Sequence, residues 1–280
     1  MSGRSLDPRP ESLVDAAAKA VLEVGGLLRE WRCDTSATSG VWEGDQFKAR
    51  ADAMAHDVLS TRLRAIDPGL PVLSEEDPDS LVDERPDRYW LIDPIDGTAS
   101  YAHGFAGYVT QAALMVGARP AAAAVYAPEP DVLYTAVRGT GAASNGRRLP
   151  TTAPAPPGKG ALIDNTPRPH GIARAAYEHF GYTEYVESGS LALKLCRIAD
   201  GSAHLFIKDV PVRDWDVAAP DLVLEETGAA LAQPDGTAFG YSGGFEHPGL
   251  VAAADPATLA SVVAWHRSRP HGGGAGDEAG

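Results

Sequence analysis

Apolar and polar positions in the first third of the chain repeat with the period of an α-helix. From Ser12 to Trp31, apolar residues recur every three or four positions, which is the spacing of one buried helix face. A second run of the same period covers residues 49–66 and stops at a Pro-Gly turn. The pattern predicts two amphipathic helices, with Ser12 capping the first helix and a loop at residues 40–45 between the two.

Short apolar runs replace the helical period between residues 71 and 150. Such runs, bounded by turn residues, predict strands, and they lie at residues 71–73, 89–92, 108–116, 121–126 and 132–137. Asn145-Gly146 then favours the tight turn of a hairpin. Beyond residue 160 the helical period returns. Helices are predicted at 172–180, 190–199 and 214–227, the last ended by Gly228, with a strand at 204–207 between them.

The alternation of helices and strands predicts an α/β fold with layers of helices and mixed sheets. The chain has 280 residues, a length that suits one large domain or two lobes. Residues 151–160 are rich in Pro, Ala and Thr, and we expect them to separate lobes at about 1–150 and 151–268. Residues 269–280 are Gly-rich without apolar periodicity, which predicts a disordered tail.

The charge balance restricts the partners that we expect. The chain has 24 Lys and Arg residues against 38 Asp and Glu residues, a formal net charge of −14 at pH 7. Such a chain repels phosphate polymers and anionic bilayers, so neither a nucleic-acid polymer nor a membrane is expected as a partner. A small phosphorylated ligand stays possible if cations within its own site receive it.

Apolar runs and cysteine usage both indicate a cytoplasmic protein. No stretch reaches the roughly 18 consecutive apolar residues that a membrane-spanning helix needs. The segment before Pro10 lacks the apolar core of a signal peptide. Cys33 and Cys196 have neither the spacing of a metal site nor that of a disulfide framework, which suits a reducing compartment.

Three acidic clusters carry the candidate chemistry. They are Glu75-Glu76-Asp77, Asp93 to Thr98, and Asp214-Trp215-Asp216, and each follows a predicted strand or opens a predicted helix. Mg²⁺ prefers oxygen ligands, and two such ions held close together need carboxylates that converge from several segments. Taken singly, the clusters also have ordinary explanations. A turn or cap explains Asp93 and Asp96 equally well, while a solvated loop or an N-cap is the better single explanation for the other two clusters.

The second cluster combines several useful groups within six residues. Pro94 fixes the backbone after Asp93, and the Ile95 carbonyl and the Asp96 carboxylate can then face the same point. Gly97 permits a sharp turn, and Thr98 adds a hydroxyl. If a helix begins here, its free amides can receive a phosphate group. Metal ions and a helix N-terminus together would let an acidic protein bind an anion.

Four segments, in order, resemble the inositol monophosphatase-like family of metal-dependent, lithium-sensitive sugar and nucleotide phosphatases. Trp-Leu-Ile-Asp-Pro-Ile-Asp-Gly-Thr, at 90–98, resembles the first family signature, and Trp-Asp-Val-Ala-Ala, at 215–219, with the acidic residues and glycine at 225–228 resembles the second. Ser74-Glu75-Glu76 and the glycine-rich hairpin at 139–149 resemble two further elements. The resemblance covers roughly residues 12–263, nearly the whole chain.

The resemblance implies an αβαβα fold of the sugar-phosphatase type, with a site that holds two or three Mg²⁺ ions between the lobes. The implied metal ligands are Glu75, Asp93, the carbonyl of Ile95, Asp96 and Asp216. Glu75, Asp52 and Thr98 are the implied catalytic residues, with Asp52 and Thr98 orienting or activating the attacking water. The amides of Gly97 and Thr98 are implied to bind phosphate, and Asp209 to contact substrate hydroxyls. A homodimer is implied as well.

The substrate is left open between branches of the family. Ala49 replaces a family threonine, and Ala-Ser-Tyr-Ala-His at 99–103 departs from the inositol-type sequence. The stretch from Ser190 to Cys196 resembles the 3′(2′),5′-bisphosphate nucleotidase branch. We therefore expect a Mg²⁺-dependent phosphomonoesterase that acts on a small phosphorylated nucleoside. The alternatives are an inositol or other sugar or polyol phosphatase, and an inactive ligand-binding homologue. Arg213 either pairs with a second anionic group of the substrate or balances acidic neighbours.

Overall fold

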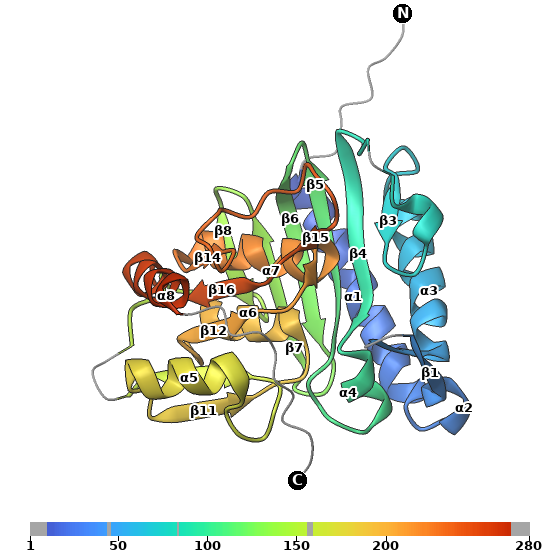
Figure 1. The fold of residues 1–280 in the computed structure, drawn as a ribbon. Helices are drawn as coiled ribbons and strands as arrows, with labels where there is room; N and C mark the ends of the chain where they lie inside the picture. Colours follow the sequence, from blue (N-terminus) through green and yellow to red (C-terminus); the bar gives the residue numbers. More distant parts are fainter. Residues whose placement is uncertain (1–9, 44–45, 83, 156–158, 270–280) are drawn as a thin grey trace, which may run out of the picture.

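Five alternating layers of helices and sheets make up the fold of the computed structural model, which describes residues 10–43, 46–82, 84–155 and 159–269 (Figure 1). The helices are α1 (Pro10–Trp31), α2 (Thr35–Thr38), α3 (Arg50–Ile66), the 3₁₀ helix η1 (Pro78–Ser80), α4 (Thr98–Ala102), α5 (Gly171–Phe180), α6 (Leu191–Ala199), α7 (Asp214–Thr227) and α8 (Pro256–Ser268). The strands are β1 (Gly40–Glu43), β2 (Gln46–Ala49), β3 (Val72–Ser74), β4 (Arg88–Asp96), β5 (Val109–Val116), β6 (Arg119–Ala127), β7 (Val132–Val137), β8 (Gly141–Ser144), β9 (Arg147–Arg148), β10 (Ala161–Asp164), β11 (Glu184–Glu187), β12 (Leu205–Lys208), β13 (Val212–Arg213), β14 (Ala230–Ala232), β15 (Glu246–His247) and β16 (Leu250–Ala253). The layered α/β prediction is confirmed.

A seven-stranded sheet forms the second layer. Its order is β3-β4-β5-β6-β7-β8-β9, antiparallel except for the parallel pair β3 and β4. Side chains alternate across β4: Trp90 and Ile92 pack with α1 and α3, whereas Tyr89 and Leu91 pack with α6 and α7. This alternation decides which helical layer each functional side chain of β4 faces.

A mixed five-stranded sheet forms the fourth layer. Its order is β11-β10-β12-β16-β14, in which β10 is parallel to β11 and β12 while β16 is antiparallel to β12 and β14. Helices α6 and α7 fill the space between the two sheets, and α5 and α8 cover the outer face. The largest buried cluster includes residues of both sheets, so one core joins the two halves of the chain. The division into two lobes stays a prediction.

The structure corrects two predicted element boundaries and one predicted loop. Helix α1 begins at Pro10, two residues before Ser12, because proline suits the first helical position, where no amide is needed. The predicted loop at 40–45 is largely a hairpin, since β1 and β2 pair antiparallel on either side of residues 44 and 45. The strand predicted at 89–92 continues to Asp96, because Asp93 and Asp96 still pair with β5 across a register shift.

The predicted hairpin turn and helix end are both confirmed. Asn145 and Gly146 have φ values of 47° and 73°, the two positive values that a type I′ turn requires between β8 and β9. Gly228, with φ of 80°, ends α7. Glu226 of α7 accepts hydrogen bonds from the amides of Gly139 and Gly141 at 2.6 and 2.7 Å, which ties the preceding glycine-rich turn to this helix.

The ends of the chain are described only in part. The predicted tail lies outside the described residues except for Arg269, whose guanidinium lies 4.6 Å from the centre of the Trp265 ring. Among the described residues, no helix combines the length and apolar character needed to cross a bilayer.

Candidate active site

Asp93 and Asp96 project from the end of β4 toward the layer that contains α7. Asp93 shares the face of Tyr89 and Leu91, and the register shift after it brings Asp96, three residues on, to the same side. A regular strand would direct residues three apart to opposite faces. The side chains are buried, with 2% and 8% of their surface exposed. The irregular end of β4 therefore lets two carboxylates that are separated by Pro94 and Ile95 point to the same side of the sheet.

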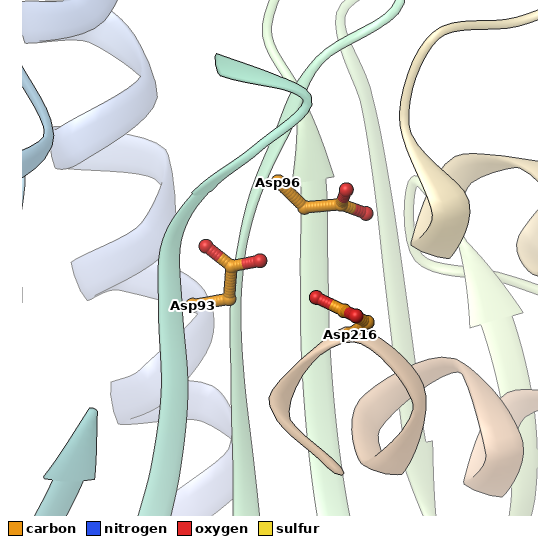
Figure 2. A group of neighbouring side chains, drawn as sticks. All are labelled: Asp93, Asp96 and Asp216. Carbon is orange, nitrogen blue, oxygen red and sulfur yellow. The ribbon is translucent and has the colours of Figure 1, made fainter. Parts of the chain in front are cut away.

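Asp216 completes a three-carboxylate cluster from the first turn of α7. Its Oδ2 accepts a hydrogen bond from the Arg213 amide at 2.8 Å, as a capping residue does. Gln111 of β5 donates to the Trp215 carbonyl at 2.9 Å, which attaches the start of α7 to the large sheet. One carboxylate oxygen each of Asp93, Asp96 and Asp216 lies within 4.8 Å of the other two (Figure 2).

Glu75 follows β3 and lines the same pocket beside the cluster. Burial raises its pKa to about 7, with neighbouring carboxylates adding to the shift and Lys48 opposing it. Burial also raises the pKa of Asp93, to which the charge of Glu75 contributes, and it raises the pKa of Asp216 to about 8. These carboxylates repel one another in a poorly hydrated space. A hard divalent cation offsets that repulsion, so the donor set fits such an ion.

Asp52 of α3 lies behind the cluster and holds Thr98. The Thr98 hydroxyl donates to Asp52 Oδ1 at 2.8 Å and also approaches the Ile95 carbonyl at 3.1 Å. The second Asp52 oxygen accepts from the amide of Ala49 at 2.7 Å. Because that contact uses the backbone, the alanine at position 49 leaves Asp52 anchored. Burial raises the pKa of Asp52 to about 7.

Gly97 links β4 to α4 in a conformation that only glycine adopts readily. Its φ is 91°, and a Cβ atom there would lie 3.0 Å from the Gly107 carbonyl oxygen and 3.4 Å from Ser190 backbone atoms. The helix expected after Gly97 is present as α4, which is short. The two halves of the chain thus meet at backbone distance beside the carboxylates.

One pocket of about 600 Å³ contains most of the predicted site. The predicted residues along its wall are Glu75, Asp93, Ile95, Asp96, Gly97, Thr98, Asp209 and Asp216. Asp52 reaches the wall through Thr98. Arg213 is not among the lining residues in the described part of the chain, and its guanidinium pairs with Glu246. A contact of Arg213 with substrate stays a prediction, and the ion pair with Glu246 agrees with the alternative role of balancing an acidic neighbour.

Residues of α6 complete the site and were missed as site residues in the sequence. Asp96 accepts hydrogen bonds from the Ser190 hydroxyl and the Ala192 amide, both at 2.6 Å, and from the Leu191 amide at 3.2 Å. Lys194 lines the pocket with 4% of its surface exposed, and burial lowers its pKa to about 8. The family-like stretch from Ser190 to Cys196 contained the signal, but only the fold places it against Asp96.

Fold and site together show a layered α/β scaffold with a largely buried carboxylate cluster that could hold a metal ion. The model of the inositol monophosphatase family matches residues 9–268, so the chain belongs to this family, which is metal-dependent and hydrolyses phosphomonoesters. The chain is therefore a phosphatase that acts on small phosphorylated substrates.

Two curated relatives and one solved structure illustrate the likeness. The chain is 30% identical over 196 residues to the 3′(2′),5′-bisphosphate nucleotidase CysQ of Escherichia coli K12, covering 69% of this chain and 78% of that protein. It is 28% identical over 244 residues to inositol monophosphatase 2 of Solanum lycopersicum, covering 82% and 90%. The suhB protein of Bartonella henselae superposes with a TM-score of 0.79 at 22% identity, covering 92% and 99%.

Proposed function

We propose that this phosphatase uses Mg²⁺ to hydrolyse small nucleotides that carry a second anionic group, of the nucleoside 3′(2′),5′-bisphosphate kind. Glu75, Asp93, Asp96 and Asp216 are the carboxylates that would hold two or three ions, together with the Ile95 carbonyl. When bound there, the ions supply Lewis acidity toward phosphoryl oxygens and lower the pKa of water.

Asp52 and Thr98 are proposed to handle the proton of the attacking water. Thr98 donates its hydroxyl hydrogen toward Asp52, so the hydroxyl oxygen is free to accept a hydrogen bond from water. The Asp52 pKa of about 7 suits a group that takes up a proton near neutral pH. We propose that the amides of Gly97 and Thr98 orient the phosphate at the same point.

The buried Lys194 is the observation that favours a second anion. Its Nζ lies 3.4 Å from the Gly189 carbonyl oxygen and 5.0 Å from the centre of the Phe206 ring. Lys208 lines the pocket as well. A buried ammonium group is costly unless anions accompany it, and although the charges of Asp96 and Asp164 act on Lys194, burial still lowers its pKa to about 8, so a substrate anion would stabilise the charge further. The carboxylate end of the pocket would take one phosphate, and the lysine end would take the other.

An inositol or other polyol phosphate is the second candidate, favoured by Asp209. This residue lines the pocket beside Lys208, where its carboxylate can accept hydrogen bonds from vicinal hydroxyls of a polyol or a ribose. The two relatives do not distinguish between the candidate substrates, since one is named a bisphosphate nucleotidase and the other an inositol monophosphatase.

Replacing Lys194 tests the substrate assignment. Phosphate release is measured for wild type and Lys194→Met on adenosine 3′,5′-bisphosphate, 3′-AMP, 5′-AMP and inositol 1-phosphate. Lost charge assistance of about 1.5–3 kcal/mol corresponds to a loss of about 10- to 150-fold in kcat/KM on the bisphosphate, with the monophosphates little changed. An equal loss on all four substrates would contradict the second-anion role. Faster wild-type hydrolysis of inositol 1-phosphate would favour the second candidate.

The predicted homodimer and cytoplasmic location complete the proposal. They rest on the family resemblance, the absence of a long apolar run and the two unpaired cysteines, Cys33 and Cys196. Light scattering on the purified chain measures the mass directly, and a monomer at micromolar concentration would contradict the dimer.

A further inference from the structure

A second polar cluster surrounds Asp214, the first residue of α7, outside the catalytic pocket. The Asp214 side chain is fully buried, with one carboxylate oxygen 2.6 Å from Arg85 Nη1 and the other 2.6 Å from His247 Nε2. The side chains of Arg85 and His247 are 6% and 8% exposed. None of the three residues lines the catalytic pocket.

Arg85 attaches the segment 239–247 to this point. Its guanidinium donates to the carbonyls of Tyr241, Gly243 and Gly244 at 2.8, 2.9 and 3.2 Å. It also lies 3.9 Å from the centre of the Phe245 ring. A single side chain that precedes β4 therefore holds a segment more than 150 residues away in the sequence.

The backbone around His247 joins the same point. His247 in β15 pairs with Val212 in β13, directly before α7, and the Asp214 amide donates to the Phe245 carbonyl at 2.9 Å. The first turn of α7 is thus fixed by a short sheet, by a buried ion pair and by a histidine contact. Gln111 fixes the opposite side of this turn through the Trp215 carbonyl.

Burying these charged side chains costs desolvation free energy, so stability alone is a weak explanation for the cluster. Well-packed apolar side chains stabilise a buried site as well as a buried ion pair does, or better, because the charges must be desolvated. The hydrogen bonds of His247 to Asp214 and of Arg85 to three backbone carbonyls instead fix direction and distance, while the Arg85–Asp214 ion pair adds charge attraction. Here the element that it fixes carries Asp216, two residues beyond Asp214, and the position of Asp216 determines whether its oxygen meets those of Asp93 and Asp96.

We propose that Arg85, Asp214 and His247 are positioning residues that hold the first turn of α7 so that Asp216 converges with Asp93 and Asp96 on a divalent cation. The proposal rests on the metal site of the proposed function. It assigns to the cluster an effect on metal affinity, rather than on the chemical step. Residues hydrogen-bonded to metal ligands change metal affinity by about 10- to 100-fold when they are lost, and we expect the lower part of this range here because the cluster acts on Asp216 through the helix turn.

Mg²⁺ affinity of purified variants, measured by calorimetry, tests the proposal without relying on turnover. Arg85→Met is expected to raise the Mg²⁺ dissociation constant by about 10-fold or more, with kcat at saturating Mg²⁺ within about threefold of wild type. Arg85→Lys keeps the charge and is expected to recover part of the affinity. Arg119→Met is the matched control, because Arg119 pairs with Glu225 near the other end of α7 on the surface, and its Mg²⁺ affinity should stay unchanged.

Two results would overturn the proposal. One is a folded Arg85→Met protein with wild-type Mg²⁺ affinity, even if its melting temperature in EDTA is lower, since this is the result of a purely structural role. The other result applies if Arg85→Met does not fold, in which case His247→Gln and His247→Leu are compared instead. The glutamine amide keeps a donor to Asp214 and the leucine side chain does not, so equal Mg²⁺ affinity of these two variants would contradict the proposal. Wild-type protein that binds no Mg²⁺ would instead contradict the proposed function, and this inference with it.

Discussion

Two groups of residues in the pocket, which we call its carboxylate end and its lysine end, are built in opposite ways, although their charges act on each other, Asp96 on Lys194 and Lys208 on Asp216. The carboxylate end depends on one short segment of β4, in which Asp93 and Asp96 are three residues apart, and on a helix start that brings Asp216 against it. The lysine end assembles Lys194 from α6 and Lys208 from β12, both from the second half of the chain. We infer that the first end determines the reaction and the second end determines the substrate, so substitutions at the two ends should have separable effects.

Asp93→Asn is expected to have the largest effect and to act equally on every substrate. The amide removes one anionic ligand and its buried charge, and the metal contribution to transition-state stabilisation amounts to several kcal/mol, so turnover should fall by about 10³-fold or more. Phosphate release measures turnover, and circular dichroism verifies that the variant is folded. Near-normal turnover would remove the metal role assigned to Asp93.

Asp52→Asn tests the proposed proton-handling role of Asp52 and Thr98 beside the proposed metal ligands. Loss of a general base typically costs about 10²- to 10⁴-fold, so kcat should fall while KM for the bisphosphate changes little. Thr98→Val should fall in the same range, because the two side chains act through one hydrogen bond of 2.8 Å. Independent, multiplicative losses in the double variant would contradict that coupling.

The raised pKa values at the carboxylate end predict an unusual pH dependence of stability. For Asp52, Glu75 and Asp216 the folded pKa lies at about 7 or 8, above the ordinary 3.8 or 4.5. Their protonated forms are favoured in the folded state, so this stabilisation is complete below pH 4 and is lost as pH rises through 7 to 8. In EDTA, the free energy of unfolding should therefore fall as the pH rises between these limits.

Mg²⁺ should reverse this trend, because it favours the deprotonated carboxylates. The melting temperature with and without Mg²⁺ at pH 6 and pH 8 measures the effect, and the stabilisation by Mg²⁺ should be larger at pH 8. A smaller Mg²⁺ effect at pH 8 than at pH 6 would contradict the account of the carboxylate end.

The comparison of the two ends also explains how far the sequence predicts the molecule. The helices α1, α3, α5, α6 and α7 and the strands from β4 to β7 were predicted from the sequence, because each contains enough residues to show its pattern, whereas α8, at Pro256–Ser268, was not predicted. Strands such as β14 and β15 are too short to show a period, and pairing with distant segments determines them. The hairpin of β1 and β2 was missed for the same reason.

The site residues also divide into those that a local sequence pattern predicts and those that only distant contacts bring together. Asp93 to Thr98 were predictable as a group because they are contiguous and resemble a family signature. The contact of Asp96 with Ser190 joins residues 94 positions apart, and that of Asp214 with His247 joins residues 33 apart. Neither contact has a local pattern, so only the fold shows them. Arg213 illustrates the reverse case, since its place beside the second signature left a substrate contact and an acidic neighbour equally open, and its side chain pairs with Glu246.

We propose, above all, that this phosphatase requires a divalent cation to hydrolyse a substrate with two anionic groups. The most direct measurement is phosphate release from adenosine 3′,5′-bisphosphate near neutral pH in EDTA, followed by titration with Mg²⁺. We predict no release in EDTA, release restored by Mg²⁺, and a higher kcat/KM than on inositol 1-phosphate. Release that persists unchanged in EDTA would contradict the metal mechanism, and no release from the bisphosphate by an enzyme active on inositol 1-phosphate would contradict the substrate.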